Sequence, residues 1–220
     1  MNNKNILLIN KPKHWTSNDV IRKFKKITKI KKVGHSGTLD PLASGLLILA
    51  YNNGTKELNK IITDDKKYNA TIHFNYETDT LDSEGVVTNY SNKKIELNSI
   101  INSLENFLKI DYYQEPPKYS AIKINGNKAY DLARKNIDFE IPKKLVKLYS
   151  YKIISYIDKE LILELHVSKG FYIRSFCRDL AKSLNTYGNL ANLIRTSIGK
   201  YQLIDAVNIE EINEDWIKQK

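Results

Sequence analysis

Residues 34–45 read GHSGTLDPLASG, and this stretch says the most about the fold and the chemistry of the chain. It places three glycines and one proline around a single acid, Asp40. Glycines permit positive φ angles and close approach of a ligand to the backbone, and Pro41 fixes the chain just after the acid. Leu39 and Leu42 could dock the stretch on a core. The pattern is typical of a catalytic loop, although a glycine-rich turn capped by Asp has the same composition.

Regular hydrophobic patterns flank this loop. Ile6 to Asn10 reads as a strand, and after a Lys11-Pro12 turn either Ser17 or Asn18 is expected to cap a helix. The apolar residues on one face of that helix are Val20, Ile21, Phe24, Ile27 and Ile30. Further along, Lys66 to Tyr76 alternates between apolar and polar residues, which predicts a half-buried strand.

The second half of the chain mixes helix and strand patterns. Helices are predicted over 95–108 and 127–135, followed by a strand with Leu161, Leu163, Leu165 and Val167 on one face. A turn at 168–170 then leads into a helix with inward residues Ile173, Phe176, Cys177, Leu180 and Leu184. The order lacks the regular alternation of a parallel sheet, so we expect an α+β fold with a mixed, mainly antiparallel sheet flanked by helices and loops. No linker or repeat marks a boundary, which predicts one domain over residues 1–220.

Composition narrows the functional class. The chain has 220 residues and a formal net charge of +10, which favours a polyanionic partner, with nucleic acid ahead of an acidic membrane. Heavy use of Lys, Asn and Ile is also expected from an A+T-rich genome, so the net charge alone does not establish that the partner is a nucleic acid. The single cysteine, Cys177, cannot form an internal disulfide, and no apolar run reaches membrane-spanning length. We therefore expect a cytoplasmic protein without membrane attachment.

Six blocks of the sequence resemble the TruB family of tRNA pseudouridine synthases, in the family's order. The blocks are LLINKPKHWTSNDVI, KKVGHSGTLDPLASGLL, KKYNATIHFNYETDTLDSEG, QEPPKYSAIKINGNKAYDLAR, VSKGFYIRSFCRDLA and NLIRTSIGKY. The resemblance implies the pseudouridine synthase fold and an isomerase that makes pseudouridine-55 in the T loop of tRNA, with neither cofactor nor metal. The partner expected from it is the T arm of tRNA; we also expect a monomer, although the sequence itself does not reveal the oligomeric state.

The resemblance assigns roles to particular residues. Asp40 matches the catalytic aspartate, Tyr68 the tyrosine that packs on the target base, and Arg174 the arginine that pairs with the aspartate. The residues expected to contact RNA are His35, Lys11, Pro12, Lys66 and Lys32.

The chemistry of these side chains is compatible with the implied reaction. The carboxylate of Asp40 could attack the sugar, attack the uracil ring or stabilise positive charge on the sugar, and the sequence leaves these alternatives open. A charge-assisted ion pair with Arg174 would keep Asp40 ionised. The alternative is that Arg174 forms only an ordinary ion pair at the surface. Tyr68 should place its ring at the edge of the core with its hydroxyl toward substrate, although a core-edge tyrosine would look the same.

Basic residues cluster near two of the blocks, where they could contact phosphates or simply form a solvated surface. They are Arg22, Lys23, Lys25, Lys26, Lys29, Lys31 and Lys32 beside the loop, and Lys118, Lys123 and Lys128 around QEPPKYSA. The histidines lack metal-binding spacing, so no metal is expected. Asp79 and Asp82 read as turn-capping acids, and Cys177 as a buried, inert thiol.

The sequence departs from the family pattern in three places. Asn75 stands where a glycine is usual, and YNNGTKELN at 51–59 replaces a more usual GxATK pattern. The chain after Tyr201 is also shorter than a C-terminal PUA-like RNA-binding domain, which we expect to be absent. Binding would then be confined to the T arm.

Three alternatives remain open: a pseudouridine synthase for another RNA, a non-catalytic RNA-binding or tRNA-folding protein, and a carboxylate-dependent glycosidase or phosphatase. A glycosidase or phosphatase of this kind would require a second acidic residue close to Asp40, and the sequence does not show one.

Overall fold

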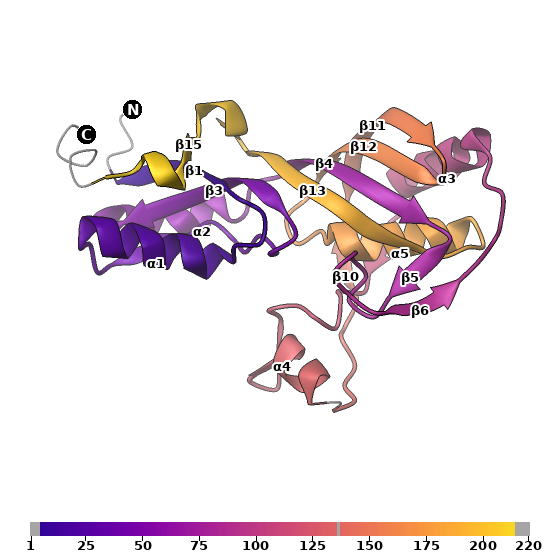
Figure 1. Cartoon of the computed structure of the whole chain (residues 1–220), viewed down its shortest axis with the longest axis horizontal. Helices are drawn as coiled ribbons and strands as arrows, with labels where there is room; N and C mark the ends of the chain where they lie inside the picture. The colour runs from indigo at the N-terminus through magenta and orange to yellow at the C-terminus, as the bar shows by residue number, and fades with distance from the viewer. Residues whose placement is uncertain (1–4, 136, 214–220) are drawn as a thin grey trace. The chain divides into compact units, whose positions relative to one another are not determined.

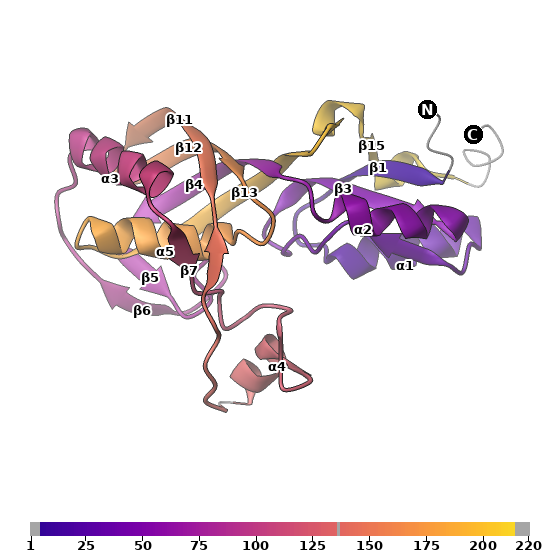
Figure 2. The same cartoon turned by 180° about the vertical axis from the view of Figure 1, so that it is seen from behind.

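A computed structural model describes residues 5–135 and 137–213. Contacts divide the chain into two compact units, the first comprising Met1–Asn69 with Leu193–Lys220 and the second Ala70–Asn192. Figures 1 and 2 show the elements of both units from opposite sides. Two strands, β4 (Lys66–Phe74) and β13 (Gly188–Ile198), have residues in both units.

The first unit is built around two antiparallel strands. β1 (Ile6–Lys11) pairs with β3 (Ser44–Tyr51) from Ile6 opposite Ala50 to Lys11 opposite Gly45. The short strand β2 (Val33–His35) pairs with β3 antiparallel, and the end of β13 pairs with the start of β3 in parallel. The remaining short elements of the unit are η1 (Asn52–Glu57), α2 (Leu58–Ile61), β14 (Tyr201–Gln202), η2 (Leu203–Asp205), β15 (Val207–Asn208) and η3 (Ile209–Glu211).

β3 is buried on both of its faces. Leu47 and Leu49 pack into a cluster with Val20 and Phe24 of α1 (Ser17–Thr28), whereas the alternate residues Leu46 and Ile48 belong to a second cluster. The second cluster also contains Ile61 of α2 and Ile198 of β13. Because side chains alternate along a strand, α1 and α2 contact opposite sides of β3. This burial explains why the strand is a continuous apolar run.

α1 begins one residue earlier than a Ser17 cap would allow. Thr16 is the N-cap: its hydroxyl accepts a hydrogen bond from the Asp19 N–H at 3.0 Å, and the Asp19 carboxylate accepts one from the Thr16 N–H at 2.8 Å. This is a capping box. The prediction that Ser17 or Asn18 caps the helix is therefore wrong, because the pattern of apolar residues did not distinguish between neighbouring polar residues.

The second unit combines a sheet with two helices on one of its faces (Figures 1 and 2). The strand order is β11 (Leu148–Ile157), β12 (Glu160–Val167), β4 and β13. The helices are α3 (Leu97–Lys109) and α5 (Ile173–Ser183), close to the predicted ranges. β11 and β12 pair antiparallel. With the pairings of the first unit, this confirms an α+β fold with a mixed, mainly antiparallel sheet.

Short antiparallel strand pairs and a small helix extend the second unit. β5 (Tyr76–Thr78) pairs with β6 (Val87–Tyr90), and β7 (Tyr112–Gln114) pairs with β10 (Lys144–Val146). Between β7 and β10 lie β8 (Lys123–Ile124), β9 (Asn127–Lys128) and α4 (Ala129–Arg134). The helix predicted over 127–135 is thus shorter, because its first two residues pair with β8 instead.

Asn75, which directly follows β4, has a left-handed backbone. Its φ is +76°, a conformation that glycine adopts most easily and that asparagine tolerates better than most other residues. Its amide donates to the Lys93 carbonyl at 2.9 Å and its side-chain oxygen accepts from the Thr186 hydroxyl at 2.8 Å. Asn75 therefore fits the bend in place of glycine, and the predicted strand over Lys66 to Tyr76 is interrupted there.

Candidate active site

The loop that carries Asp40 connects β2 to β3 and is fixed at several points of its backbone. The Ser36 N–H donates to the Ile48 carbonyl at 2.9 Å, and the His14 N–H donates to the Pro41 carbonyl at 2.7 Å. A further bond within the loop joins the Ala43 N–H to the Asp40 carbonyl at 3.1 Å. The loop therefore has a defined conformation, as a catalytic loop requires.

Two leucines anchor the same loop, as the sequence predicted. Leu39 and Leu42 are 4% and 5% exposed, whereas Asp40 between them is partly exposed. The apolar neighbours thus hold the backbone against the core and leave the carboxylate with access to solvent or substrate.

Gly45, the second residue of β3, lies where two strands come close together. It lies opposite Arg195 in the parallel pairing of β3 with β13, and its φ is +104°. A Cβ at this position would lie 2.4 Å from the Arg195 carbonyl oxygen. Only glycine satisfies both the backbone angle and the close approach.

His35, at the end of β2, is held as a neutral ring. The Gly37 N–H donates to its Nδ1 at 3.2 Å, so this nitrogen carries the lone pair and the proton resides on Nε2. Burial lowers the pKa of His35 below its usual value, and the positive charge of Arg195 acts in the same direction. His35 can therefore offer a single Nε2–H donor near neutral pH, which suits its predicted contact with RNA.

Lys11 and Pro12 lie at the turn that precedes α1. Lys11 is fully buried, and its ammonium donates to the carbonyls of Pro12 at 2.9 Å and Trp15 at 2.6 Å. Because His14 in the same turn binds the Asp40 loop, Lys11 stabilises the turn that supports the loop. Its predicted contact with RNA stays a prediction, as does that of Pro12.

Lys66 and Tyr68 project from the same face of β4. The ammonium of Lys66 donates to the carbonyls of Ile62, at 2.8 Å, and Asp64, and the residue is 8% exposed. Lys66 therefore satisfies carbonyls that follow α2, and its predicted contact with RNA stays a prediction. Tyr68 is also 8% exposed, and its hydroxyl forms no hydrogen bond with the residues that the structure describes. A tyrosine with a buried ring and an uncommitted hydroxyl is compatible with the predicted role at a substrate base.

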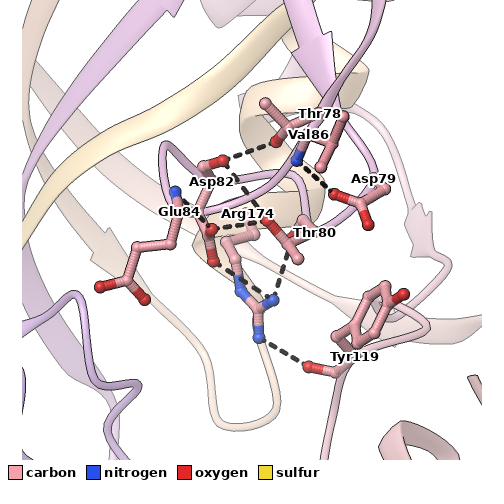
Figure 3. A network of polar contacts seen from close by, with 8 residues as sticks. All are labelled: Thr78, Asp79, Thr80, Asp82, Glu84, Val86, Tyr119 and Arg174. Carbon is pink, nitrogen blue, oxygen red and sulfur yellow. Dashed lines mark hydrogen bonds and ion pairs between the residues drawn. The ribbon is translucent and has the colours of Figure 1, made fainter. Parts of the chain in front are cut away.

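Arg174, the second residue of α5, is the centre of a buried polar network (Figure 3). Its guanidinium donates to the carbonyls of Thr80 and Tyr119, each at 3.0 Å, and lies 3.5 Å from a carboxylate oxygen of Asp82. Asp82 in turn accepts from the Thr80 hydroxyl at 2.6 Å and the Glu84 N–H at 3.1 Å. The side chains of Arg174 and Asp82 are only 6% and 8% exposed. The network fixes the position of the arginine.

Sequence reasoning found only part of the role of Asp82. The predicted capping function is seen in the bond from Glu84, and Asp79 has a similar function because it accepts from the Val86 N–H at 2.8 Å. The ion pair of Asp82 with Arg174 was not predicted. Arg174 and Asp40 belong to different units, and the pair between them stays a prediction.

Replacing Asp82 with alanine is expected to destabilise the protein by about 2–3 kcal/mol, because buried donors lose their charged acceptor. Asp79→Ala is the matched control: Asp79 is exposed, so its loss should cost about 1 kcal/mol or less. Urea unfolding of both variants measures the difference. Equal, small losses would show that the ion pair contributes little to the fold.

Basic side chains are exposed in both predicted clusters. In the segment of α1 and its exit, the exposed residues are Arg22, Lys23, Lys26, Lys29, Lys31 and Lys32, while Lys25 is half-buried. In the second unit Lys118, Lys123 and Lys128 are exposed, and Lys128 and Arg134 lie 5.2 Å and 5.5 Å from the ring centre of Tyr130. Both clusters are accessible to a polyanion.

Other kinds of site receive little support. Within residues 5–135 and 137–213, no group of three His, Cys, Asp or Glu side chains is placed to hold a metal ion. No helix in this part of the chain has the length and apolar character needed to span a membrane. Cys177 is fully buried, and burial raises the pKa of its thiol, so it is a poor source of thiolate.

Comparison with known proteins identifies the family. A model described as the TruB family pseudouridylate synthase, N-terminal domain, matches residues 25–173. The chain belongs to the TruB family. Similar relatives are the tRNA pseudouridine synthase B of Ureaplasma urealyticum serovar 10, 51% identical over 97% of this chain and 94% of the relative, and that of Malacoplasma penetrans, 47% identical over 93% and 89%.

A solved structure shares the fold of this chain. A crystal structure of a Cbf5-Nop10-Gar1 complex matches 97% of this chain with a TM-score of 0.73 at 22% identity. The chain spans 54% of the length of that matched chain. At this identity the likeness concerns the fold, and it agrees with the pseudouridine synthase fold that the sequence blocks predicted.

Proposed function

We propose that the protein converts uridine-55 in the T loop of tRNA to pseudouridine. The observation that carries this proposal is the fixed loop with Asp40, in a chain of the TruB family whose relatives are named tRNA pseudouridine synthase B. The single partly exposed acid between two buried leucines supports a catalytic rather than a merely structural loop.

The reaction moves the sugar from one atom of the uracil ring to another. The glycosidic bond between N1 and C1′ breaks, a new bond joins C5 to C1′, and the proton on C5 leaves while N1 gains one. The isomerisation involves no net oxidation or reduction. Asp40 supplies the carboxylate that the sugar or the base needs while the ring rotates. Arg174 stabilises Asp40 in its ionised form, and Tyr68 stacks on the base and helps to remove the C5 proton.

The substrate must be extruded before it can react. A stacked T-loop uridine costs a few kcal/mol to flip, and contacts with the RNA must compensate. Exposed lysines and arginines on α1 and in the region of α4 supply phosphate contacts, and the Nε2–H of His35 can hold the opened loop. We propose that the protein acts as a cytoplasmic monomer that binds the T arm.

The experiment incubates purified protein with an unmodified tRNA transcript and maps pseudouridine by chemical derivatisation and primer extension. A single stop at position 55, absent with Asp40→Asn protein, is the expected result. Stops at other positions would mean that the enzyme acts on another RNA site. No stop, with retained tRNA binding by a folded protein, would favour a non-catalytic RNA-binding or tRNA-folding role.

Binding should weaken steeply with salt. With about five phosphate contacts, the association constant is expected to fall roughly 10²- to 10³-fold between 50 and 200 mM salt. Replacing Lys32 with glutamine should reduce the slope of log K against log salt by about one. Lys60→Gln is the matched control, since Lys60 is an exposed lysine on α2, which contacts the opposite side of β3. Filter binding measures both slopes, and a flat response of the wild type would contradict binding through the phosphates.

A further inference from the structure

Two neighbouring hydroxyls at the start of α1 have different partners. Thr16 caps the helix through Asp19, so the helix end does not need the hydroxyl of Ser17. The Ser17 hydroxyl instead contacts the loop at Leu39: it accepts from the Leu39 N–H at 2.9 Å and lies 3.3 Å from the Leu39 carbonyl, to which it can donate. Ser17 is 3% exposed, so water does not readily replace these bonds.

The bonds of Ser17 fall at the residue just before Asp40. On the other side of Asp40, the His14 N–H holds the Pro41 carbonyl at 2.7 Å. The first unit therefore fixes the backbone immediately before and immediately after the carboxylate. Both contacts come from residues 14–17, at and just before the start of α1, and they hold the backbone on each side of the partly exposed Asp40.

Arg195 fixes the two ends of the same loop. Its side chain is 2% exposed and donates to the Leu46 carbonyl at 2.7 Å and to the Gly37 carbonyl at 3.4 Å. With both ends and Pro41 held independently, loss of the Ser17 hydroxyl would loosen the backbone near Leu39 without releasing the rest of the loop. The effect on Asp40 would be a shift in position, not an unfolded loop.

We propose that Ser17 is a positioning residue for catalysis, which holds the Asp40 carboxylate in its reactive position through the backbone of Leu39. The proposal rests on the proposed function. Reactions that depend on a fixed near-attack geometry lose about 10²-fold in rate for a displacement of 1 Å. RNA binding depends on other side chains, so the expected defect lies in the chemical step and leaves affinity unchanged.

The test compares Ser17→Ala with Thr16→Ala. Both remove one hydroxyl from the start of α1, but only the first removes the contact with Leu39. For Ser17→Ala the single-turnover rate constant at saturating protein should fall about 10- to 100-fold, with the dissociation constant for tRNA within twofold of wild type. Thr16→Ala should lose comparable stability and keep its rate within twofold. Ser17→Thr, which retains a hydroxyl, should recover most of the rate.

A second measurement reports on the contact independently of activity. Hydrogen exchange of the Leu39 amide, followed by NMR, should be faster in Ser17→Ala than in wild type or Thr16→Ala, because the amide loses its acceptor. Unchanged exchange would overturn the contact, and an unchanged rate, or an equal rate loss in Thr16→Ala, would overturn the positioning role. A wild type that makes no pseudouridine would contradict the proposed function and the positioning role of Ser17 together, while exchange would still decide whether the contact exists.

Discussion

Asp40→Asn protein is expected to form pseudouridine at least about 10⁴-fold more slowly than wild type, the scale of loss seen when a central catalytic group is removed. The amide has nearly the same shape as the carboxylate but cannot attack carbon or balance a positive charge. Because Asp40 is partly exposed and its loop is held through backbone atoms, the variant should fold normally. Single-turnover release of the C5 tritium from labelled tRNA measures the rate.

The control for this variant is Asp111→Asn, which removes an exposed carboxylate just after α3. It should keep the wild-type rate. Thermal unfolding and filter binding of both variants establish that structure and tRNA affinity are intact. An Asp40→Asn protein that retains a rate within tenfold of wild type would remove Asp40 from the chemistry and leave the loop a structural role.

Periodicity in the sequence was sufficient to predict most of the elements around the site. The strand with Leu161 to Val167 and the helix from Ile173 lie where their apolar spacing placed them, because each buries one regular face. β13, in contrast, reads GNLANLIRTSI and shows no clean alternation, so no strand was predicted there. Its position between β4 and β3 depends on pairing with distant segments, which local pattern does not encode.

The candidate site shows the same division between local and non-local information. The composition of the loop was enough to single out Asp40, but the groups that hold the loop come from residues far apart in the chain. Ser17 offered a weak signal, since a helix start needs only one capping hydroxyl and the sequence has two. Arg195 offered another as the one charged residue in the segment GNLANLIRTSI.

Two buried lysines show that the sequence alone does not reveal which groups a lysine contacts within the fold. The RNA contacts predicted for Lys11 and Lys66 stay predictions, and within the structure their ammonium groups donate to carbonyls of nearby turns. Whether a lysine points inward depends on carbonyls left unpaired by the fold, and these are known only once the turns are in place.

Tyr68→Phe should leave folding intact and slow turnover about 10²- to 10⁴-fold, the usual contribution of a positioned acid or base. The ring remains buried in β4, and the lost hydroxyl forms no hydrogen bond with the described residues, so stability should change by less than about 1 kcal/mol. The tRNA dissociation constant should also stay near that of wild type, because the phenyl ring can still stack on the base.

Tyr156→Phe is expected to have the opposite effects on rate and stability from Tyr68→Phe. The Tyr156 hydroxyl donates to the Ile95 carbonyl at 3.1 Å, so its removal should lower stability by about 1 kcal/mol and leave the single-turnover rate unchanged. The two variants make the same chemical change at tyrosines of the same fold, so their contrast separates proton transfer from packing. A Tyr68→Phe protein that turns over like Tyr156→Phe would restrict Tyr68 to stacking and require another group to take the C5 proton.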